Sequence, residues 1–362
     1  MVLRLLLVVL IFTNCTNAKQ EKLEDKAKPK NIILLIGDGT GLSQISASQF
    51  YNDETSNYDR FKHIGLIKTS SSSDPITDSA AGATAFASGV KTYNGAIGVD
   101  HDTIGVTTIL EKLAEKGYSS GLIATSSITH ATPASFFAHV PYRRQEDAIA
   151  LALAESRVNF FAGGGRNFFN KNKRKDTISG FDLLTRKQFQ LDTIDLPSTT
   201  TILDQNKKYA YLLANNGMPK MTEGRGDFLP KATKLGLNHL SQNKTGFFMM
   251  TEGSQIDWGG HENNTDYLVS ELIDFDTTIG IALDYAQSNT ETLVIVTADH
   301  ETGGFSLSSK KGNYNQLEPT FSTGGHTATM VPVFAFGPGS EEFQGIYENT
   351  EIYHKLVQLL GL

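Results

Sequence analysis

The feature that most constrains the fold is a set of short segments that are apolar on both faces. Residues 32–36 read IILLI and residues 293–297 read LVIVT, without the alternation of a half-exposed strand. Strands that are apolar on both faces are typical of a mostly parallel sheet that helices cover on both sides. We therefore expect these segments to be buried strands of such a sheet.

Strands and helices alternate along the chain from about Lys30. This order predicts an α/β fold with a doubly wound, mainly parallel central sheet flanked by helices. The predicted strands are Ile32–Ile36, Gly121–Ala124, Asn159–Ala162, Ala210–Leu213, Gly246–Met250, Leu293–Thr297 and Val331–Phe336. The predicted helices are residues 106–116, 145–156, 231–242, 265–287 and 349–360. In such sheets, ligands bind beyond the carboxyl ends of the strands.

The beginning of the chain differs in character from the rest. An apolar run at residues 5–12 follows Arg4 and is too short to span a bilayer, so residues 1–15 are expected to be a signal peptide or lipoprotein signal. Cys15, the only cysteine, is either a lipid-attachment residue or lies near a cleavage site. Residues 16–29 are polar and predict a flexible tether. The protein is therefore expected to be exported in a bacterium, to the periplasm, the outer membrane or the medium.

Residues 30–362 are expected to form one domain, with a peripheral excursion around 163–230, where the pattern is less regular. The 32 Lys and Arg residues against 39 Asp and Glu give a net charge of −7, which argues against a general polyanion binder and against nucleic-acid-specific binding. A basic cluster within the excursion is expected to be a solvated surface. Its members are Lys171, Lys173, Arg174 and Lys175.

Polar side chains follow four of the predicted strands, at the point where each strand ends. One such residue alone is typical of a turn or a helix cap, but its recurrence at four strand ends indicates a ligand-binding constellation. The residues are Asp38, Thr132 with His130 before it, Glu252, and Asp299 with His300.

Two further groups supply imidazoles. Asp257 and His261 are four residues apart, so both point the same way on a helical turn, and His326 directly precedes the last predicted strand. Carboxylates with neutral imidazoles suit Zn²⁺ or a similar borderline ion. Groups that offer only oxygen, such as Asp38 and Glu252, suit Mg²⁺ better. The sequence therefore predicts a cluster of two or three metal ions.

Ser79, in DSAAGATAFASG, is the candidate nucleophile. The small residues after it predict a tightly packed helix, whose N-terminus favours an anion, although a simple serine N-cap explains the position equally well. A serine hydroxyl is a poor nucleophile unless it is activated, and a metal ion that stabilises the alkoxide would activate it. Arg143, eleven residues beyond Thr132, is the one cation expected near the site, because its planar fork matches two oxygens of a phosphate.

In combination, the motifs of this chain resemble those of the alkaline phosphatase family from about Lys30 to the C-terminus. They are IGDGTG, DSAAGATAFASG, THATPASFFAHVPYR, EGSQIDWGGH, TADHETGGFSL and GHTATMVPVFAFGPG. Within the family, the chain looks most like the compact, cold-adapted Antarctic bacterial type. The resemblance implies a homodimer with a mainly parallel sheet between helices. It also implies metal-dependent hydrolysis of small phosphate monoesters through a phosphoserine intermediate.

The resemblance further implies a role for each residue of the constellation. Ser79 would be phosphorylated, and Arg143, oriented by Asp78, would bind the phosphate. The chain departs from the pattern of the enteric bacterial enzyme at two positions: His130 stands where that enzyme has Asp, and Trp258 stands where it has Lys. These two substitutions bear on the third metal and on how phosphate is held. Two zinc ions and one magnesium ion would be bound. The first zinc would be held by Asp257, His261 and His326, and the second by Asp38, Asp299 and His300. The magnesium would be held by Thr132 and Glu252, with Asp38 bridging.

Other functions on the same frame stay open. A phosphodiesterase of the same superfamily or an inactive metal- or phosphate-binding protein would share the metal ligands. A sulfatase of the cysteine-modified kind is argued against, because the only cysteine is Cys15. Arg143 favours a monoester, whose extra unesterified oxygen a diester lacks.

Overall fold

The computed structural model describes residues 28–362. The predicted signal at 1–15 and the tether up to residue 27 lie outside the described residues. The strands are β1 (Asn31–Gly37), β2 (His63–Lys68), β3 (Ser119–Ser127), β4 (Phe160–Gly164), β5 (Phe189–Asp192), β6 (Lys208–Leu212), β7 (Phe247–Gly253), β8 (Thr292–Thr297), β9 (Glu301–Thr302), β10 (Phe305–Lys310), β11 (Asn313–Phe321), β12 (His326–Thr327), β13 (Val331–Phe336) and β14 (Gly345–Glu348).

The α-helices lie between these strands. They are α1 (Leu42–Tyr51), α2 (Ser79–Ser88), α3 (Ile109–Glu115), α4 (Ala131–Ala134), α5 (Glu146–Glu155), α6 (Arg166–Phe169), α7 (Gly180–Arg186), α8 (Phe228–Leu240), α9 (Gln255–His261), α10 (Thr265–Ser288) and α11 (Glu351–Leu360). Within the part of the chain that the structure describes, no helix combines the length and apolar character needed to cross a membrane.

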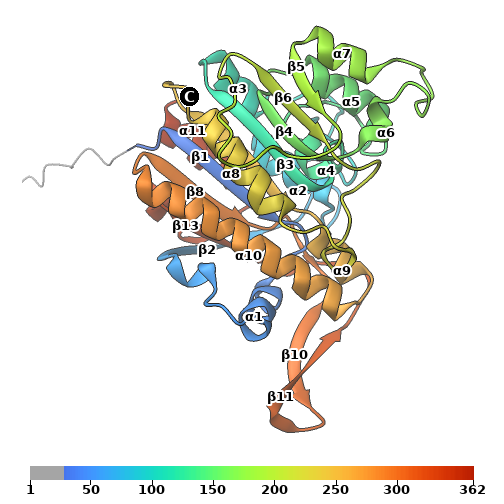
Figure 1. Cartoon of the computed structure of the whole chain (residues 1–362). Coiled ribbons are helices and arrows are strands. Elements are labelled where there is room, and N and C mark those ends of the chain that lie inside the picture. Colours follow the sequence, from blue (N-terminus) through green and yellow to red (C-terminus); the bar gives the residue numbers. More distant parts are fainter. Residues whose placement is uncertain (1–27) are drawn as a thin grey trace, which may run out of the picture.

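The strands form a large sheet with helices on both faces (Figure 1). It has 10 strands in the order β14-β2-β13-β8-β1-β7-β3-β4-β6-β5. Strand β13 runs antiparallel to β2 and β8, and the other neighbouring strands are parallel. The predicted α/β class with a doubly wound, mainly parallel sheet is confirmed.

Strand β1 shows why its sequence is apolar at every position. Ile32, Leu34 and Ile36 pack in the core on one face of the sheet, with residues of α2, α3, α5 and α11. Ile33 and Leu35 pack in the core on the other face, with residues of α8 and α10. Because successive side chains of a strand point to opposite faces, a strand between two cores has no polar position.

Several elements differ from the sequence prediction. Helix α8 begins at Phe228, before Pro230, because proline is tolerated in the first turn of a helix, where its missing N–H has no partner to lose. Strands β2, β5 and β14 and helix α1 were not predicted. Their short or partly exposed segments lack a continuous apolar pattern, as the burial along β2 shows.

Residues 163–230 contain strands β5 and β6, which extend one edge of the large sheet. The expectation of a solvated basic cluster in this region is wrong for Arg174, whose side chain is 0% exposed. Its guanidinium donates to the carbonyl oxygen of Asp147 (2.9 Å) and pairs with the carboxylate of Asp176. These partners compensate the burial of the charge, which a charge count along the sequence does not reveal.

Candidate metal centre

The order of the central strands brings the four polar strand ends together. Strands β8, β1, β7 and β3 are consecutive in the sheet and parallel, so their carboxyl ends share one edge. Ile36 of β1 lies opposite Glu252 of β7, and Asp38 follows two residues later. The side chains of Asp38, Glu252 and Asp299 are 0% exposed. The site is therefore built at the edge where open α/β sheets bind ligands.

Among the described residues, three groups of side chains place ligand atoms within 4.8 Å of one another. Two of these groups match the predicted zinc sets, and in the third His130 joins two residues that were predicted to hold magnesium. The groups are Asp257, His261 and His326; Asp38, Asp299 and His300; and Asp38, His130 and Glu252.

The first group joins two distant segments. Asp257 and His261 lie on α9, and His326 comes from β12, which pairs with β9. The Nε2 atoms of His261 and His326 lie 3.3 and 3.6 Å from the Asp257 carboxylate. Each Nδ1 contacts a backbone carbonyl, of Gly324 (2.7 Å) for His261 and of Thr77 (2.9 Å) for His326. These bonds favour the tautomers that leave both Nε2 lone pairs for a metal ion.

The second group lies directly beside the predicted nucleophile. His300 Nε2 is 3.5 Å from Asp38 Oδ1 and 3.4 Å from Asp299 Oδ2. Ser79 Oγ lies 3.4 Å from the same nitrogen, at the first residue of α2. Gly82, one turn further along α2, allows this approach, because an added Cβ would lie 3.0 Å from the Cβ of Asp299. The helix N-terminus and the metal-ligand set thus share one space.

Arg143 reaches the same space from the loop before α5. Its Nη1 donates to Asp78 Oδ2 (2.9 Å), and its Nη2 contacts His130 Nε2 (3.2 Å). Asp78 also caps α2, where the Ala81 N–H donates to its Oδ1 (3.0 Å). Burial alone would raise the pKa of Asp78, but Arg143 and the cap outweigh burial and lower it. The ring of Trp258 meets that of His130 edge-on, with centroids 6.0 Å apart.

Several buried oxygens of the site have no hydrogen-bond partner. Among residues 28–362, the atoms without a hydrogen bond include both carboxylate oxygens of Asp38 and one oxygen each of Thr132, Glu252 and Asp299. Burial raises the pKa of Glu252 to about 7, and burial with the charge of Asp257 raises that of Asp299 to about 6. Burial also raises the pKa of Asp38, and neighbouring carboxylates add to the rise. Divalent cations would satisfy these oxygens, so the donor set fits metal ions.

The histidines of the site are mostly held neutral. Burial lowers the pKa of His300 to about 4, and burial with the nearby Arg143 lowers that of His130 to about 3. The hydrogen bond to Asp257 instead raises the pKa of His261 to about 9. Neutral imidazole is the form that binds metal, and displacement of a proton by a cation would give it at His261 as well.

Two supporting residues were not predicted. Thr302 Oγ1 donates to Asp257 Oδ1 (2.5 Å) and contacts His300 Nδ1 (3.2 Å). These contacts link the two groups of side chains that were predicted to hold zinc. Ser254 Oγ donates to Glu252 Oε2 (2.6 Å). Ser254 follows Glu252 closely in EGSQ, a local signal that the sequence offered, whereas the contact of Thr302 with Asp257 is made only by the tertiary fold.

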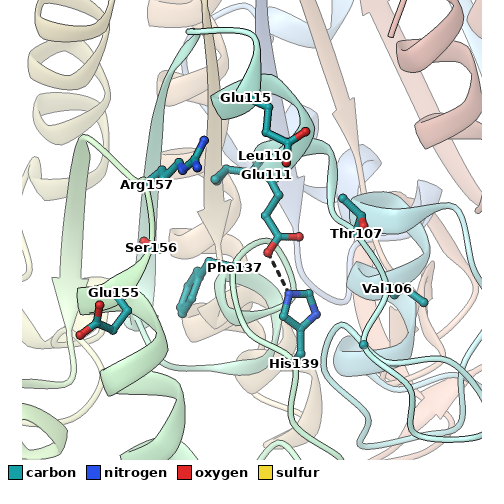
Figure 2. Close-up of a pocket in the computed structure, with 11 residues that line it drawn as sticks. Val106, Thr107, Leu110, Glu111, Glu115, Phe137, His139, Glu155, Ser156 and Arg157 are labelled. Carbon is teal, nitrogen blue, oxygen red and sulfur yellow. Dashed lines mark hydrogen bonds and ion pairs between the residues drawn. The ribbon is translucent and has the colours of Figure 1, made fainter.

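Two cavities of the same volume differ in their relation to the site. One, of about 540 Å³, adjoins Arg143 and is lined by Asp78, Asn94, Gly95, His130, Tyr142, Arg143, Arg144 and Glu146. Figure 2 shows another of the same volume, which contains none of the predicted metal ligands. There Glu111 and His139 pair with each other at 2.9 Å. The cavity beside Arg143 is therefore the one that bears on the chemistry of the site.

Fold and site together define a metal-binding α/β protein with a serine and an arginine at its centre. A family model described as alkaline phosphatase matches residues 29–320. This chain belongs to the alkaline phosphatase family, which confirms the resemblance seen in the motifs.

Comparison with individual relatives supports the same family. The solved structure of alkaline phosphatase from the Antarctic bacterium TAB5 is 53% identical, with a TM-score of 0.90, and the match covers 93% of this chain and 99% of that one. A His-to-Asp variant of the TAB5 enzyme has been solved with magnesium bound. Alkaline phosphatase 3 of Bacillus subtilis is 32% identical over 95% of this chain and 92% of its own length. The Escherichia coli enzyme is 30% identical over 96% and 89%. The predicted likeness to the compact Antarctic type is confirmed.

Proposed function

We propose that the reaction proceeds through a phosphoserine intermediate on Ser79. As a member of the alkaline phosphatase family, the protein hydrolyses phosphate monoesters in a metal-dependent reaction. The observation that carries the proposal is the position of Ser79 Oγ, at the N-terminus of α2 and 3.4 Å from His300 Nε2. Arg143, held by Asp78, is the cation beside it.

We assign the metal ligands as the sequence predicted them. Zn²⁺ and Mg²⁺, when bound, supply positive charge to the phosphoryl oxygens and lower the pKa of the hydroxyls that act as nucleophiles. His130 and Trp258 lie beside the third site and shape its ligand set and the phosphate position. Zinc would be held by Asp257, His261 and His326 and by Asp38, Asp299 and His300, and magnesium by Thr132, Glu252 and Asp38.

The chain's own residues perform two displacements. Arg143 binds two phosphoryl oxygens, and Ser79 Oγ attacks phosphorus in line, so that the Ser79 O–P bond forms while the ester P–O bond breaks and the alcohol leaves. Water then attacks the phosphoserine, which releases inorganic phosphate and restores the serine hydroxyl. Two inversions retain the configuration at phosphorus. Net inversion with a chiral phosphate ester would exclude the covalent step.

Replacement of Ser79 by Ala tests the nucleophile. We expect turnover of 4-nitrophenyl phosphate to fall by at least about a thousandfold, because the covalent step is lost. Ser88→Ala is the matched control, since Ser88 is the last residue of the same helix and its hydroxyl donates only to the Thr84 carbonyl (2.8 Å). Near-normal turnover in Ser79→Ala would refute the assignment.

Substrate choice and chelation separate the alternatives. A phosphate monoester and the matching diester are hydrolysed at alkaline pH before and after chelation, with zinc and magnesium added back separately. We expect the monoester to be preferred and its hydrolysis to require both metals. Preference for the diester would favour a phosphodiesterase, and bound metal without turnover would favour a binding protein.

Further properties of the protein belong to this proposal. We propose that residues 30–362 act as one catalytic domain and that the protein is a homodimer, which light scattering coupled to size exclusion would test. We also propose export, with Cys15 either lipidated or removed by cleavage, and mass spectrometry of the purified N-terminus would distinguish these fates. Substrates are small phosphate monoesters, with no nucleic-acid-specific binding.

A further inference from the structure

We propose that the cavity beside Arg143 binds a second anionic group of the substrate, with Arg144 as the cation that receives it. The preferred substrates are then monoesters that carry a second phosphate at a short distance from the first. This inference rests on the proposed function, because it concerns the same active site.

The two arginines enter one cavity from a fixed turn. Arg143 and Arg144 are consecutive, and both line the cavity of about 540 Å³. The Arg143 N–H donates to the Gly95 carbonyl (2.7 Å), and the Gln145 N–H donates to the Tyr142 carbonyl (3.0 Å). These backbone bonds hold the turn against the loop after α2. The turn therefore presents both arginines to the same cavity.

The two arginines differ in how their charge is used. The guanidinium of Arg143 is paired with Asp78. Among residues 28–362, Arg144 has no carboxylate oxygen within 4.0 Å, and its guanidinium carbon lies 6.0 Å from the ring centroid of Tyr142. A contact with a ring face leaves the N–H donors of a guanidinium available to an anion.

Neither acidic residue that lines this cavity forms an ion pair with Arg144. Asp78 is paired with Arg143 and caps α2. Glu146 Oε2 accepts hydrogen bonds from Thr129 Oγ1 (2.7 Å) and Ser127 Oγ (3.0 Å). Arg144 is thus the cation of the cavity whose donors are available. An arginine fork binds phosphate through paired, charge-assisted hydrogen bonds.

The effect on catalysis should be moderate, because Arg144 is exposed. A solvent-exposed ion pair contributes about 1 kcal/mol, which corresponds to a preference of about fivefold in kcat/KM. The preference should weaken as ionic strength rises, since salt screens exposed charges.

The test compares propyl phosphate with propane-1,3-diyl bisphosphate, using the metal-loaded full enzyme. We expect the ratio of the two kcat/KM values, bisphosphate over monophosphate, to fall about fivefold in Arg144→Gln and to be largely restored in Arg144→Lys. Arg157→Gln is the matched control, because Arg157 is an exposed arginine in the separate cavity of Figure 2. It removes the same charge and should leave the ratio unchanged.

The outcomes separate this inference from the proposed function. If the unmodified enzyme fails to hydrolyse propyl phosphate, the proposed function fails. If it hydrolyses propyl phosphate but Arg144→Gln leaves the ratio unchanged, only the second-anion site is refuted. An equal fall of the ratio in Arg157→Gln would also refute it, because the preference would then come from the net charge of the protein.

Discussion

At the scale of single residues, close backbone approach shapes the metal centre. Gly39, directly after Asp38, has a φ of +73°, and an added Cβ would lie 2.8 Å from the Cα of Asp257. Its N–H donates to Asp299 Oδ1 (3.2 Å). Only glycine adopts this conformation at such a distance without strain, so one residue allows three ligand-bearing segments to meet.

Gly217 offers a test of such packing at Trp258. An added Cβ would lie 2.7 Å from Trp258 Cη2, so Gly217→Ala should displace the indole and the adjoining His130. Trp258 is the only tryptophan, so its emission spectrum reports this site alone. We expect a shifted emission maximum and, from overpacking, a free energy of unfolding lower by roughly 1–3 kcal/mol. We expect kcat/KM to fall about tenfold, because His130, which contacts Arg143, is displaced.

Gly105→Ala is the control for this variant. An added Cβ at Gly105 would lie 3.5 Å from His139, which is an ordinary contact. Gly105 is also far along the chain from the metal ligands. It should leave emission and kcat/KM unchanged. If Gly217→Ala behaves in the same way, the position of Trp258 does not depend on this contact.

At the scale of elements, a buried charge cluster fixes the loop beside the site to the long helix. Arg225 Nη2 contacts Glu271 Oε2 (2.5 Å) and Asp274 Oδ2 (2.8 Å) of α10, and all three side chains are less than 5% exposed. In the preceding part of this loop, the Met218 carbonyl accepts from Gln255 Nε2 of α9 (2.7 Å). The loop that covers Trp258 is therefore anchored to both helices.

Arg225→Met should destabilise the protein strongly. The variant leaves two buried carboxylates without their cation, which reduces the free energy of unfolding by about 3–5 kcal/mol, as measured by urea denaturation. Replacing all three residues, as Arg225→Met with Glu271→Gln and Asp274→Asn, should recover part of the loss. Lys68→Met, at a pair with 56% and 41% exposed side chains, should change stability by less than about 1 kcal/mol. Equal effects of the two single variants would contradict the argument.

At the scale of the whole molecule, the metal ions and the fold stabilise each other. In the metal-free protein, the pKa values of Asp38, Glu252 and Asp299 are raised by burial, and neighbouring carboxylates add to the rise. The folded form then binds more protons than the unfolded form. The stability contributed by their protonation is present below the unfolded pKa and is lost as pH rises through the folded values.

These carboxylates should therefore destabilise the chelated protein as pH rises from about 4.5 through the values of about 6 for Asp299 and about 7 for Glu252, whereas the lowered pKa values of His130 and His300 act in the opposite sense. The carboxylate contribution is isolated as the difference in pH dependence between the unmodified protein and Glu252→Gln. Thermal unfolding measured across this range, with and without zinc and magnesium, would show it. Added metal should remove the loss, because cations bind the ionised carboxylates. A chelated Glu252→Gln variant with the same pH dependence of stability as the unmodified protein would contradict this account of Glu252.

Much of the architecture was already specified by the sequence itself. Segments such as 32–36 and 293–296 are apolar at every position because each contributes to two cores, and that burial requirement is written locally. The polar residues at the strand ends and Ser79 interrupt the apolar pattern, so they were also visible. These signals depend on whether a residue is buried among apolar or polar surroundings. They do not depend on which segment of the chain supplies those surroundings.

The tertiary structure alone decided which elements meet. The order β8-β1-β7-β3 places four strand ends side by side, and the pairing of β12 with β9 brings His326 to Asp257. The contact of Thr302 with Asp257, the hydrogen bond of buried Arg174 to Asp147 and the cavity that Arg143 shares with Asp78 and Asn94 arise in the same way. Such contacts join residues far apart in the chain, and local propensity and periodicity carry no information about their partners.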